Sequence, residues 1–401
     1  MTGSADHRPT RRVLLINRVA FLGGVERVLL TLATGLQEFY WEPMLACPDQ
    51  GALADAALEL GVALVPCPFD RMRITANPVV LARYPLAWLR GAQAIKRHCR
   101  ENTVDLIHVH HPVTALYALP ALRRLGIPLV LHVHETLPAR PLYQAALRVA
   151  IRYAAVTLCV SGAARDLAIS LGADATRAHV VYNGIDPRFF NEADEAVKPA
   201  RVENAGIGPH VGVFGVLEPR KAQHIFLEAA TAIVSKFPEA RFWLVGPAAF
   251  ADKMSYADRL KRMIEGSSLR GRAFLVGFQP DARDWLAAMD VIVQPSVALE
   301  SFGMALAEAQ ALGRPVIASN VGGMPEVVSE GVTGLLVPPG NAPALAAAMV
   351  SLLEDPERRA AFGNCGMVEA RRRFAPDVFR RRIAEFYDLA VESNQSSALG
   401  H

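Results

Sequence analysis

Cysteine is scarce in this 401-residue sequence, and none of its five cysteines stands in a Cys-x-x-Cys pair. An odd, scattered set of this kind argues against a zinc site and favours reduced thiols in the cytoplasm. No apolar run approaches the ~20 residues of a membrane span. The N-terminus, Met-Thr-Gly-Ser-Ala-Asp-His-Arg, lacks the apolar core of a signal peptide. We therefore expect a cytoplasmic protein.

Apolar residues make up 52% of the chain and charged residues 20%, which is typical of a folded globular protein. Residues 1–190 hold 20 Lys and Arg against 14 Asp and Glu, a net charge of +6, whereas the remainder is net negative. The basic half could contact an anionic acceptor or the inner face of a membrane. An Arg-rich composition without a localised patch explains the charge equally well. We expect no nucleic-acid partner.

Short apolar runs alternate with helix-like segments through both halves of the chain. This alternation predicts an α/β fold of two doubly wound parallel-sheet domains that face a central cleft. We expect the first domain at residues 1–190, a linker at 191–209 and the second domain at 210–375. A closing helix at 376–392 could pack back on the first domain.

Two features of the first half suggest a ligand. The Gly23-Gly24 turn between a strand and a helix would let the backbone approach a ligand, although a tight turn alone explains it. Histidines end two successive strands: His108 and His110 share one face, and His132 and His134 share another. A metal site is one explanation, but no further ligand pattern supports it. We expect one or two polar residues at the strand ends, and no metal.

Glu300 and Glu308 bracket seven residues of which only Ser301 is polar. A helix across this stretch would separate the two carboxylates by roughly 12 Å. That distance suits the sugar and the ribose of one nucleotide-sugar, with the helix N-terminus facing the phosphates. Taken by itself, the pair is better explained as two solvent-facing acids of an amphipathic helix, so its context decides.

That context is a set of motifs that span nearly the whole chain. They are Gly23-Gly24-Val-Glu26-Arg27, Asn183-Gly184-Ile185-Asp186, Glu300-Ser-Phe-Gly-x4-Glu308, Gly313-x-Pro315-Val316-Ile317-Ala318, Gly322-Gly323-x-x-Glu326 and Gly331-x-Thr333-Gly334-Leu335-Leu336-Val337. Together these motifs resemble the retaining glycosyltransferases of family GT4, which have the GT-B fold of two Rossmann-like domains.

The resemblance implies a UDP-, GDP- or ADP-linked sugar donor held mainly by the second domain. The acceptor, a glycan, a lipid-linked compound or a small molecule, would be held by the first. Glu308 would bind the ribose, Glu300 the hydroxyl groups of the transferred sugar, and Lys221 the diphosphate. The resemblance also implies that N–H groups of Phe302, Gly303 and Met304 bind the sugar and diphosphate, and that Gly277 and Phe278 contact the base. In the first domain, Gly23 and Gly24 would lie near the phosphates and acceptor, and His134 would contact the transferred sugar.

One position departs from the family pattern. The family usually has an arginine directly after the glycine of this loop and a lysine five positions later, with both cations on the diphosphate. Here Val216 stands where the arginine is expected. A charge-assisted bond to phosphate contributes about 1.5–3 kcal/mol. We expect Arg220, next to Lys221, to supply the second positive charge.

The resemblance also implies the reaction. The sequence has no Asp-x-Asp, the metal–diphosphate clamp of the other major glycosyltransferase fold, so no divalent metal cofactor is expected. Retention would follow from front-face transfer, in which Glu300 orients the sugar and forms no covalent adduct. The product would be a cell-surface glycan, polysaccharide or glycolipid. Alternatives are a sugar-nucleotide epimerase, a phosphorylase, or a catalytically silent sugar-binding protein, which only Val216 favours.

Overall fold

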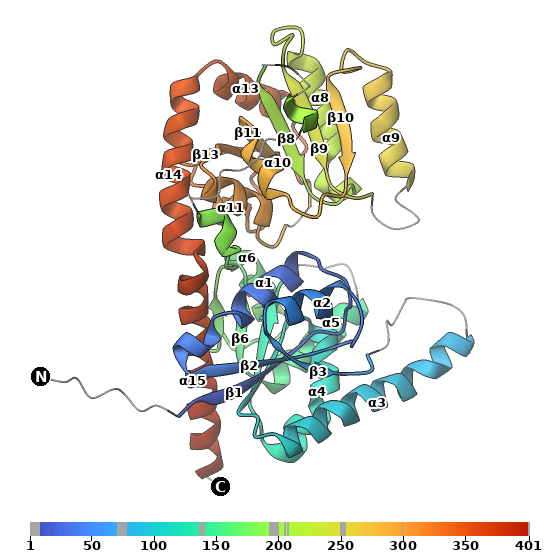
Figure 1. The fold of residues 1–401 in the computed structure, drawn as a ribbon, viewed down its shortest axis with the longest axis vertical. Helices are drawn as coiled ribbons and strands as arrows, with labels where there is room; N and C mark the ends of the chain where they lie inside the picture. Colours follow the sequence, from blue (N-terminus) through green and yellow to red (C-terminus); the bar gives the residue numbers. More distant parts are fainter. Residues whose placement is uncertain are drawn as a thin grey trace, which may run out of the picture. The chain divides into compact units, whose positions relative to one another are not determined.

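The computed structural model describes residues 9–69, 78–135, 141–191, 200–203, 206, 208–248, 254–298 and 300–399. The chain forms two compact units, one made of Met1–Gly184 with Pro376–His401 and the other of Ile185–Ala375. Each unit is a parallel sheet with helices packed on its faces (Figure 1). The predicted pair of doubly wound domains is therefore confirmed.

The sheet of the first unit has seven strands in the order β3-β2-β1-β4-β5-β6-β7. Its strands are β1 (Arg11–Ile16), β2 (Trp41–Cys47), β3 (Ala63–Pro66), β4 (Leu106–Val109), β5 (Leu129–Val133), β6 (Ala154–Cys159) and β7 (Ala178–Val180). Strands β4 and β5 are buried at every residue, as expected for central strands covered on both faces. The strand order reverses between β1 and β4, and ligands of such sheets bind outside the strand ends at this reversal.

The helices of the first unit include one from the far end of the chain. They are α1 (Gly24–Ala33), α2 (Ala52–Glu59), α3 (Pro78–Glu101), α4 (Pro112–Leu125), α5 (Pro141–Tyr153), α6 (Gly162–Ser170) and α15 (Pro376–Leu399), with the short 3-10 helix η1 (Leu36–Phe39). Helix α15 is fixed to this unit by polar and aromatic contacts. The Arg380 guanidinium donates to the carbonyl oxygen of Thr31 at 2.8 Å, and the Tyr387 ring packs edge-on against Trp41.

The second unit has a six-stranded sheet in the order β10-β9-β8-β11-β12-β13. Its strands are β8 (His210–Phe214), β9 (Arg241–Val245), β10 (Ala273–Gly277), β11 (Val291–Gln294), β12 (Val316–Ser319) and β13 (Gly334–Val337). Its helices are α7 (Ala200–Glu203), α8 (Gln223–Ile233), α9 (Met254–Glu265), α10 (Arg283–Ala287), α11 (Met304–Ala311), α12 (Met324–Val327), α13 (Ala342–Leu353) and α14 (Pro356–Phe374), with the 3-10 helices η2 (Pro187–Phe190) and η3 (Pro219–Lys221). The strand order reverses between β8 and β11, where the loops carrying Lys221 and Glu300 begin.

The units meet in sequence at Gly184 and Ile185, shortly before the expected domain end at residue 190. Of the expected linker, residues 192–199, 204, 205 and 207 lie outside the described residues. Within the part of the chain that the structure describes, no helix combines the length and apolar character that crossing a bilayer would require.

Candidate functional site

Three charged side chains from two loops meet at one point of the second unit. Glu300 lies between β11 and α11, and Arg220 and Lys221 lie in η3, after β8. The Nζ atom of Lys221 is 2.6 Å from Oε2 of Glu300, and Nη1 of Arg220 is 3.2 Å from the same oxygen. Arg220 also pairs through Nε with Oε1 of Glu218 at 2.7 Å. One carboxylate therefore holds two cations that stand far from it in the sequence.

A short chain of hydrogen bonds orients the Glu300 carboxylate. The Nε2 group of Gln294 donates to Oγ of Ser296 at 3.1 Å, and that hydroxyl donates to Oε2 of Glu300 at 3.4 Å. Gln294 and Ser296 are buried, and the Glu300 side chain is only 14% exposed. The carboxylate is thus held in one direction by partners that solvent does not displace.

The environment of Glu300 favours its ionised form. Burial by itself would raise the pKa of this carboxyl, but the adjacent Lys221 and Arg220 outweigh burial and lower its pKa below the ordinary value. A carboxyl whose pKa is depressed in the folded state stabilises the fold above its ordinary pKa. That contribution is lost as the pH falls through the lowered value. At neutral pH, Glu300 is a carboxylate that accepts hydrogen bonds.

The backbone of Glu300 is fixed by the Gly322-Gly323 turn. The N–H of Gly323 donates to the carbonyl oxygen of Glu300 at 2.7 Å. Gly322 has φ +63°, and a Cβ at this residue would lie 2.2 Å from the same oxygen. Any side chain at Gly322 would therefore displace the Glu300 loop. The Gly322-Gly323 motif is visible in the sequence. Its contact with Glu300 is not, because the two segments are far apart along the chain.

The predicted helix across Glu300 to Glu308 is wrong in its first turn. Helix α11 begins at Met304, because Gly303 has φ +100° and turns the chain just before it. Glu300 thus lies in the preceding loop, and the 12 Å spacing based on a continuous helix does not apply. The carbonyl oxygen of Gly303 accepts from Leu306 and Ala307, so the N–H groups of Gly303 and Met304 precede the bonds of the helix.

The remaining predicted residues of this stretch flank the helix start. Phe302 is buried and packs edge-on against Phe374, with ring centroids 5.4 Å apart, which anchors the loop. Glu308 lies in α11, past its first turn, and is partly exposed. A helix N-terminus carries a partial positive charge. The loop therefore places positive backbone and side-chain charge around one carboxylate.

The loop that carries Lys221 has an unusual backbone. Gly215 has φ +135°, and a Cβ there would come within 3.8 Å of Cε of Lys221. Ala222 adopts a left-handed conformation with φ +53° and is fully buried, which costs an alanine roughly 1–2 kcal/mol. The carbonyl oxygen of Val216 accepts from Nε2 of Gln223 at 3.0 Å. Val216 thus contributes to the loop through its backbone, and Arg220 supplies the nearby charge.

Gly277 is the last residue of β10, an edge strand of this sheet, and Phe278 follows it. Gly277 has φ +83°, and its carbonyl oxygen accepts from Gly246 at 2.9 Å. The Phe278 side chain is 60% exposed, which offers an aromatic face at the end of the sheet where ligands bind. Arg220, Lys221 and Glu300 are in direct contact, and Gly277 and Phe278 lie at the end of a strand of the same sheet. Gly23, Gly24 and His134 belong to the other unit.

Gly23 lies directly before α1 and Gly24 is its first residue, and the surroundings of the two glycines differ. The N–H of Gly23 donates to Oε2 of the buried Glu26 at 3.0 Å, and Nδ2 of Asn17 donates to Oε1 of the same carboxylate at 3.0 Å. A Cβ on Gly23 would lie 2.8 Å from the Glu26 carboxylate, whereas a Cβ on Gly24 would meet no atom within 4 Å. A side chain at Gly23 would thus displace the Glu26 carboxylate, whereas one at Gly24 would displace nothing.

This difference allows a clean test of the turn. We expect Gly24→Ala to keep or raise the melting temperature, because alanine favours helix, while lowering kcat/KM at least about tenfold if a ligand approaches the turn. Gly23→Ala should lower the melting temperature because it displaces Glu26. Thermal unfolding and initial rates of both variants make the measurement. Full activity in Gly24→Ala would show that no ligand approaches Gly24.

His134 is buried at the end of β5 and belongs to a stack of imidazoles. Its Nε2 lies 2.9 Å from Nδ1 of His110, and its ring lies 4.1 Å from that of His132, centroid to centroid. Burial and the neighbouring histidines hold the pKa of His134 well below its ordinary value, so the ring is neutral at pH 7.

The prediction that the two histidine pairs lie on different faces is wrong. Strands β4 and β5 pair in parallel with Val109 opposite Leu131, so His110 falls opposite His132. The rings of His108, His110, His132 and His134 therefore stack on one face of the sheet. Register between strands decides this, and the pattern of a single strand does not contain it.

Family models match most of the chain. Residues 22–189 match the model described as "Glycosyltransferase Family 4", and residues 208–355 match "Glycosyl transferases group 1". The chain is 31% identical over 327 residues to a D-inositol 3-phosphate glycosyltransferase of Thermobispora bispora, covering 76% of this chain and 75% of that protein. It is 28% identical over 348 residues to a phosphatidyl-myo-inositol mannosyltransferase of Mycolicibacterium smegmatis, covering 85% and 83%.

Solved structures share the architecture. HepE of Anabaena, in complex with UDP and glucose, superposes with a TM-score of 0.80 at 26% identity, covering 94% of this chain and 98% of that one. Sucrose-phosphate synthase of Thermosynechococcus elongatus superposes with a TM-score of 0.76 at 20% identity, covering 94% and 98%, which bears on the fold alone. Together with the two parallel sheets, these matches confirm the expected GT-B fold.

Proposed function

Because the chain belongs to glycosyltransferase family 4, we propose that it transfers a sugar from a nucleotide-diphosphate sugar to an acceptor hydroxyl with retention of anomeric configuration. The observation that carries this proposal is the contact of Lys221 and Arg220 with the Glu300 carboxylate beside the start of α11. Two cations and a helix N-terminus suit a diphosphate, and an oriented carboxylate suits sugar hydroxyl groups.

The donor would exchange partners within this cluster. In the donor-free state, Glu300 neutralises Lys221 and Arg220. An incoming diphosphate carries more negative charge than one carboxylate and competes for both cations. Glu300 is then released to accept hydrogen bonds from the sugar. The side-chain cluster would therefore assemble its catalytic form only when the donor is bound.

The other proposed donor contacts are those that the family resemblance implies. Gly303 and Met304, together with the backbone of Phe302, would present N–H groups to the sugar and diphosphate. Glu308 would bind the ribose from the second turn of α11, and the exposed Phe278 ring beside Gly277 would stack on the base. Gly23, Gly24 and His134 would serve the acceptor side and the transferred sugar.

The departing diphosphate would be stabilised by Lys221, Arg220 and the helix N-terminus, so the reaction would need no divalent metal. A carboxylate whose pKa is lowered by two cations is a weak base and a weak nucleophile. We therefore assign Glu300 to orienting the sugar, and the leaving phosphate to accepting the proton of the acceptor hydroxyl. A glycosyl adduct on Glu300, detected by intact-protein mass spectrometry after rapid quenching, would contradict this assignment.

The relatives suggest the substrates to examine first. HepE was crystallised with UDP-glucose, and two relatives are a D-inositol 3-phosphate glycosyltransferase and a phosphatidyl-myo-inositol mannosyltransferase. We propose a nucleotide-sugar donor of the UDP or GDP class and an acceptor that carries a phosphorylated inositol, as a small molecule or a glycolipid. The product would enter cell-surface glycan or glycolipid synthesis on the cytoplasmic side.

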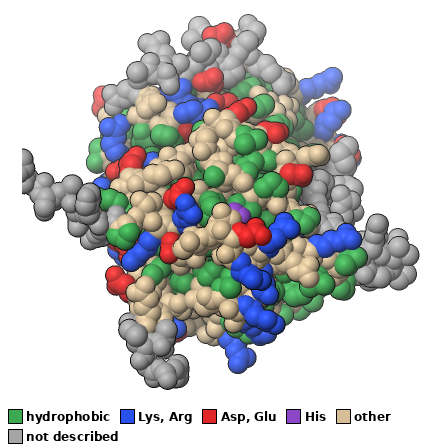
Figure 2. Space-filling view, turned by 60° about the horizontal axis from the view of Figure 1, so that its bottom comes forward, with side chains coloured by type: hydrophobic (Ala, Val, Ile, Leu, Met, Phe, Trp, Pro, Cys, Tyr) green, Lys and Arg blue, Asp and Glu red, His purple; other side chains and the backbone are tan. Residues whose placement is uncertain are grey.

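Contact with an anionic membrane is a further part of the proposal. Figure 2 shows several Lys and Arg side chains close together in the lower right of the view. In the first unit, surface hollows on α3 and α4 are lined by basic residues, and Leu86 and Leu89 of α3 are exposed. The basic residues of these hollows are Lys96, Arg97, Arg100, Arg123 and Arg124. Such a surface suits acidic headgroups.

Co-sedimentation with phosphatidylglycerol vesicles tests the membrane contact. We expect Arg97→Glu/Arg100→Glu to reduce binding, and phosphatidylcholine vesicles to bind little protein. If the parent protein and the Arg97→Glu/Arg100→Glu variant bound equally to the anionic vesicles, the basic surface on α3 and α4 would not be the membrane contact.

A donor screen tests the reaction itself. Purified protein is incubated with UDP-, GDP- and ADP-sugars, with and without myo-inositol phosphate or phosphatidylinositol, and release of the nucleoside diphosphate is followed in the presence of EDTA. We expect one donor to be consumed faster with an acceptor present. Turnover of donor into another nucleotide-sugar without acceptor would identify an epimerase instead, and no turnover with any donor would favour a sugar-binding protein.

A further inference from the structure

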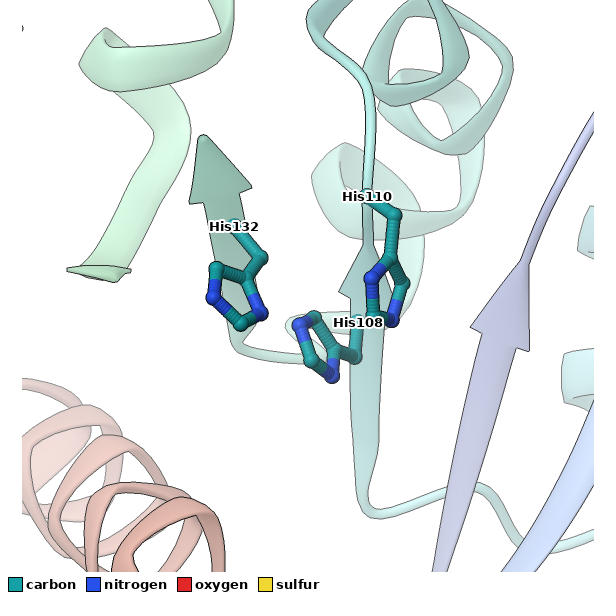
Figure 3. A group of neighbouring side chains, drawn as sticks. All are labelled: His108, His110 and His132. Atoms are coloured by element: carbon teal, nitrogen blue, oxygen red, sulfur yellow. The ribbon is translucent and has the colours of Figure 1, made fainter. Parts of the chain in front are cut away.

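Three histidines of the imidazole stack in the first unit lie close enough together to share one metal ion. His108 and His110 of β4 and its extension lie beside His132 of β5, with one ring nitrogen of each within 4.8 Å of one nitrogen of the other two. Figure 3 shows the three rings side by side on the two neighbouring strands. All three side chains are buried, at 0%, 3% and 0% exposure. This cluster is separate from the Lys221–Glu300 cluster, which lies in the other unit.

Several nitrogens of the stack have no hydrogen-bond partner among the described residues. These are Nε2 of His108, Nε2 of His110, and both ring nitrogens of His132. Each buried polar atom left without a partner costs about 1–3 kcal/mol. Four such atoms in one place are therefore costly, and an ion bound by one nitrogen of each ring would satisfy three of them. A metal ion takes the lone pairs of neutral imidazoles directly.

The other nitrogens of the stack are already fixed. Nδ1 of His108 lies 2.5 Å from the Tyr387 hydroxyl, and Nδ1 of His110 lies 2.9 Å from Nε2 of His134. Metal-binding histidines generally donate their second ring N–H to such a partner, which sets the tautomer and leaves the other nitrogen bare. The same two histidines that have a free Nε2 thus have an anchored Nδ1.

We propose that His108, His110 and His132 bind a transition-metal ion that prefers nitrogen ligands, of the Zn²⁺ or Co²⁺ class. Zn–N bonds of about 2.1 Å in tetrahedral geometry place nitrogens about 3.4 Å apart and lie in the ring planes. The stacked rings would therefore turn toward the ion as well as move closer together around it. The site ties β4 and β5 to α15 through Tyr387. Its role is structural, and it is independent of the proposed glycosyl transfer, which needs no metal.

The test uses the full-length protein without a histidine tag, because a tag binds the same ions. Co²⁺ is supplied during expression in metal-limited medium or by prolonged incubation. We expect one equivalent of Co²⁺, visible d–d absorption, and X-ray absorption that shows imidazole nitrogens. Added Zn²⁺ should displace Co²⁺ and raise the melting temperature by about 5 °C.

Variants distinguish metal binding at this site from nonspecific metal binding elsewhere on the protein. His132→Phe is expected to weaken Co²⁺ binding at least about 100-fold, and Tyr387→Phe about 10- to 100-fold. The matched control is His179→Phe, since His179 lies on β7 of the same sheet, stacks on Phe386 of α15, and is outside the cluster; it should bind as the parent does.

His132→Cys keeps a ligand at the same place and should show a thiolate-to-cobalt charge-transfer band. This variant decides the matter if His132→Phe fails to fold. The proposal is overturned if the parent protein binds less than a stoichiometric amount of Co²⁺ and Zn²⁺. It is equally overturned if His132→Phe and His179→Phe bind alike, or if His132→Cys shows no thiolate band.

Discussion

Replacing Lys221 with methionine is expected to lower kcat/KM for the donor about 100- to 1,000-fold, the usual effect of deleting one group that stabilises developing charge. The Lys221 ammonium is only 14% exposed and lies 2.6 Å from Glu300, so water is poorly placed to replace it. Methionine retains the length and apolar stem of the side chain. Initial rates over a range of donor concentrations make the measurement.

Variants of Arg220 and Lys236 provide a smaller expected effect and a control for the Lys221 prediction. Arg220 is 42% exposed, so solvent screens its charge, and Arg220→Ala should raise the Michaelis constant for the donor about tenfold. Lys236 is a matched control because it is more exposed and pairs with Glu354 on the surface; Lys236→Met should leave the rates unchanged. If Arg220→Ala left the Michaelis constant unchanged, Arg220 would not be the substitute for the arginine missing at Val216.

Glu300→Gln is expected to reduce the transfer rate about 100-fold or more and yet to tighten the binding of the free nucleoside diphosphate severalfold. The rate falls because the amide cannot orient sugar hydroxyl groups as a carboxylate does. Binding tightens because Glu300 no longer competes with the diphosphate for Lys221 and Arg220. Calorimetric titration with UDP, or with the diphosphate that the donor screen identifies, measures the second effect.

Glu308→Gln is the control, and it is expected to change the affinity for the nucleoside diphosphate in the opposite direction. It removes a carboxylate from α11 without changing the charge that faces Lys221, so it should weaken binding of the same diphosphate through the ribose. Two glutamates of one motif are thus expected to change affinity in opposite directions. Weakening of similar size in both variants would show that Glu300 does not exchange partners with the donor.

Much of the fold follows from local patterns. Apolar runs such as Val291–Val293 can be buried only between two helical layers, and their alternation with helices requires parallel sheets. The motif context also selected Glu300, Glu308 and Lys221. The predicted start of α11 is wrong because Gly303 adopts a positive φ. The sequence shows that a glycine is present but does not show whether its φ is positive.

The sequence by itself determined the two alternating domains, the family, and which residues carry charge near the proposed donor site. Only the tertiary structure decided that Arg220 and Lys221 share one oxygen of Glu300, that Gly322 and Gly323 hold its backbone, and that four histidines form one stack. The physical reason is the range of the interactions. The periodic pattern of apolar residues and their burial are properties of residues that are neighbours in the sequence. The contacts named above arise from strand order and register, which bring together loops that are far apart in the chain.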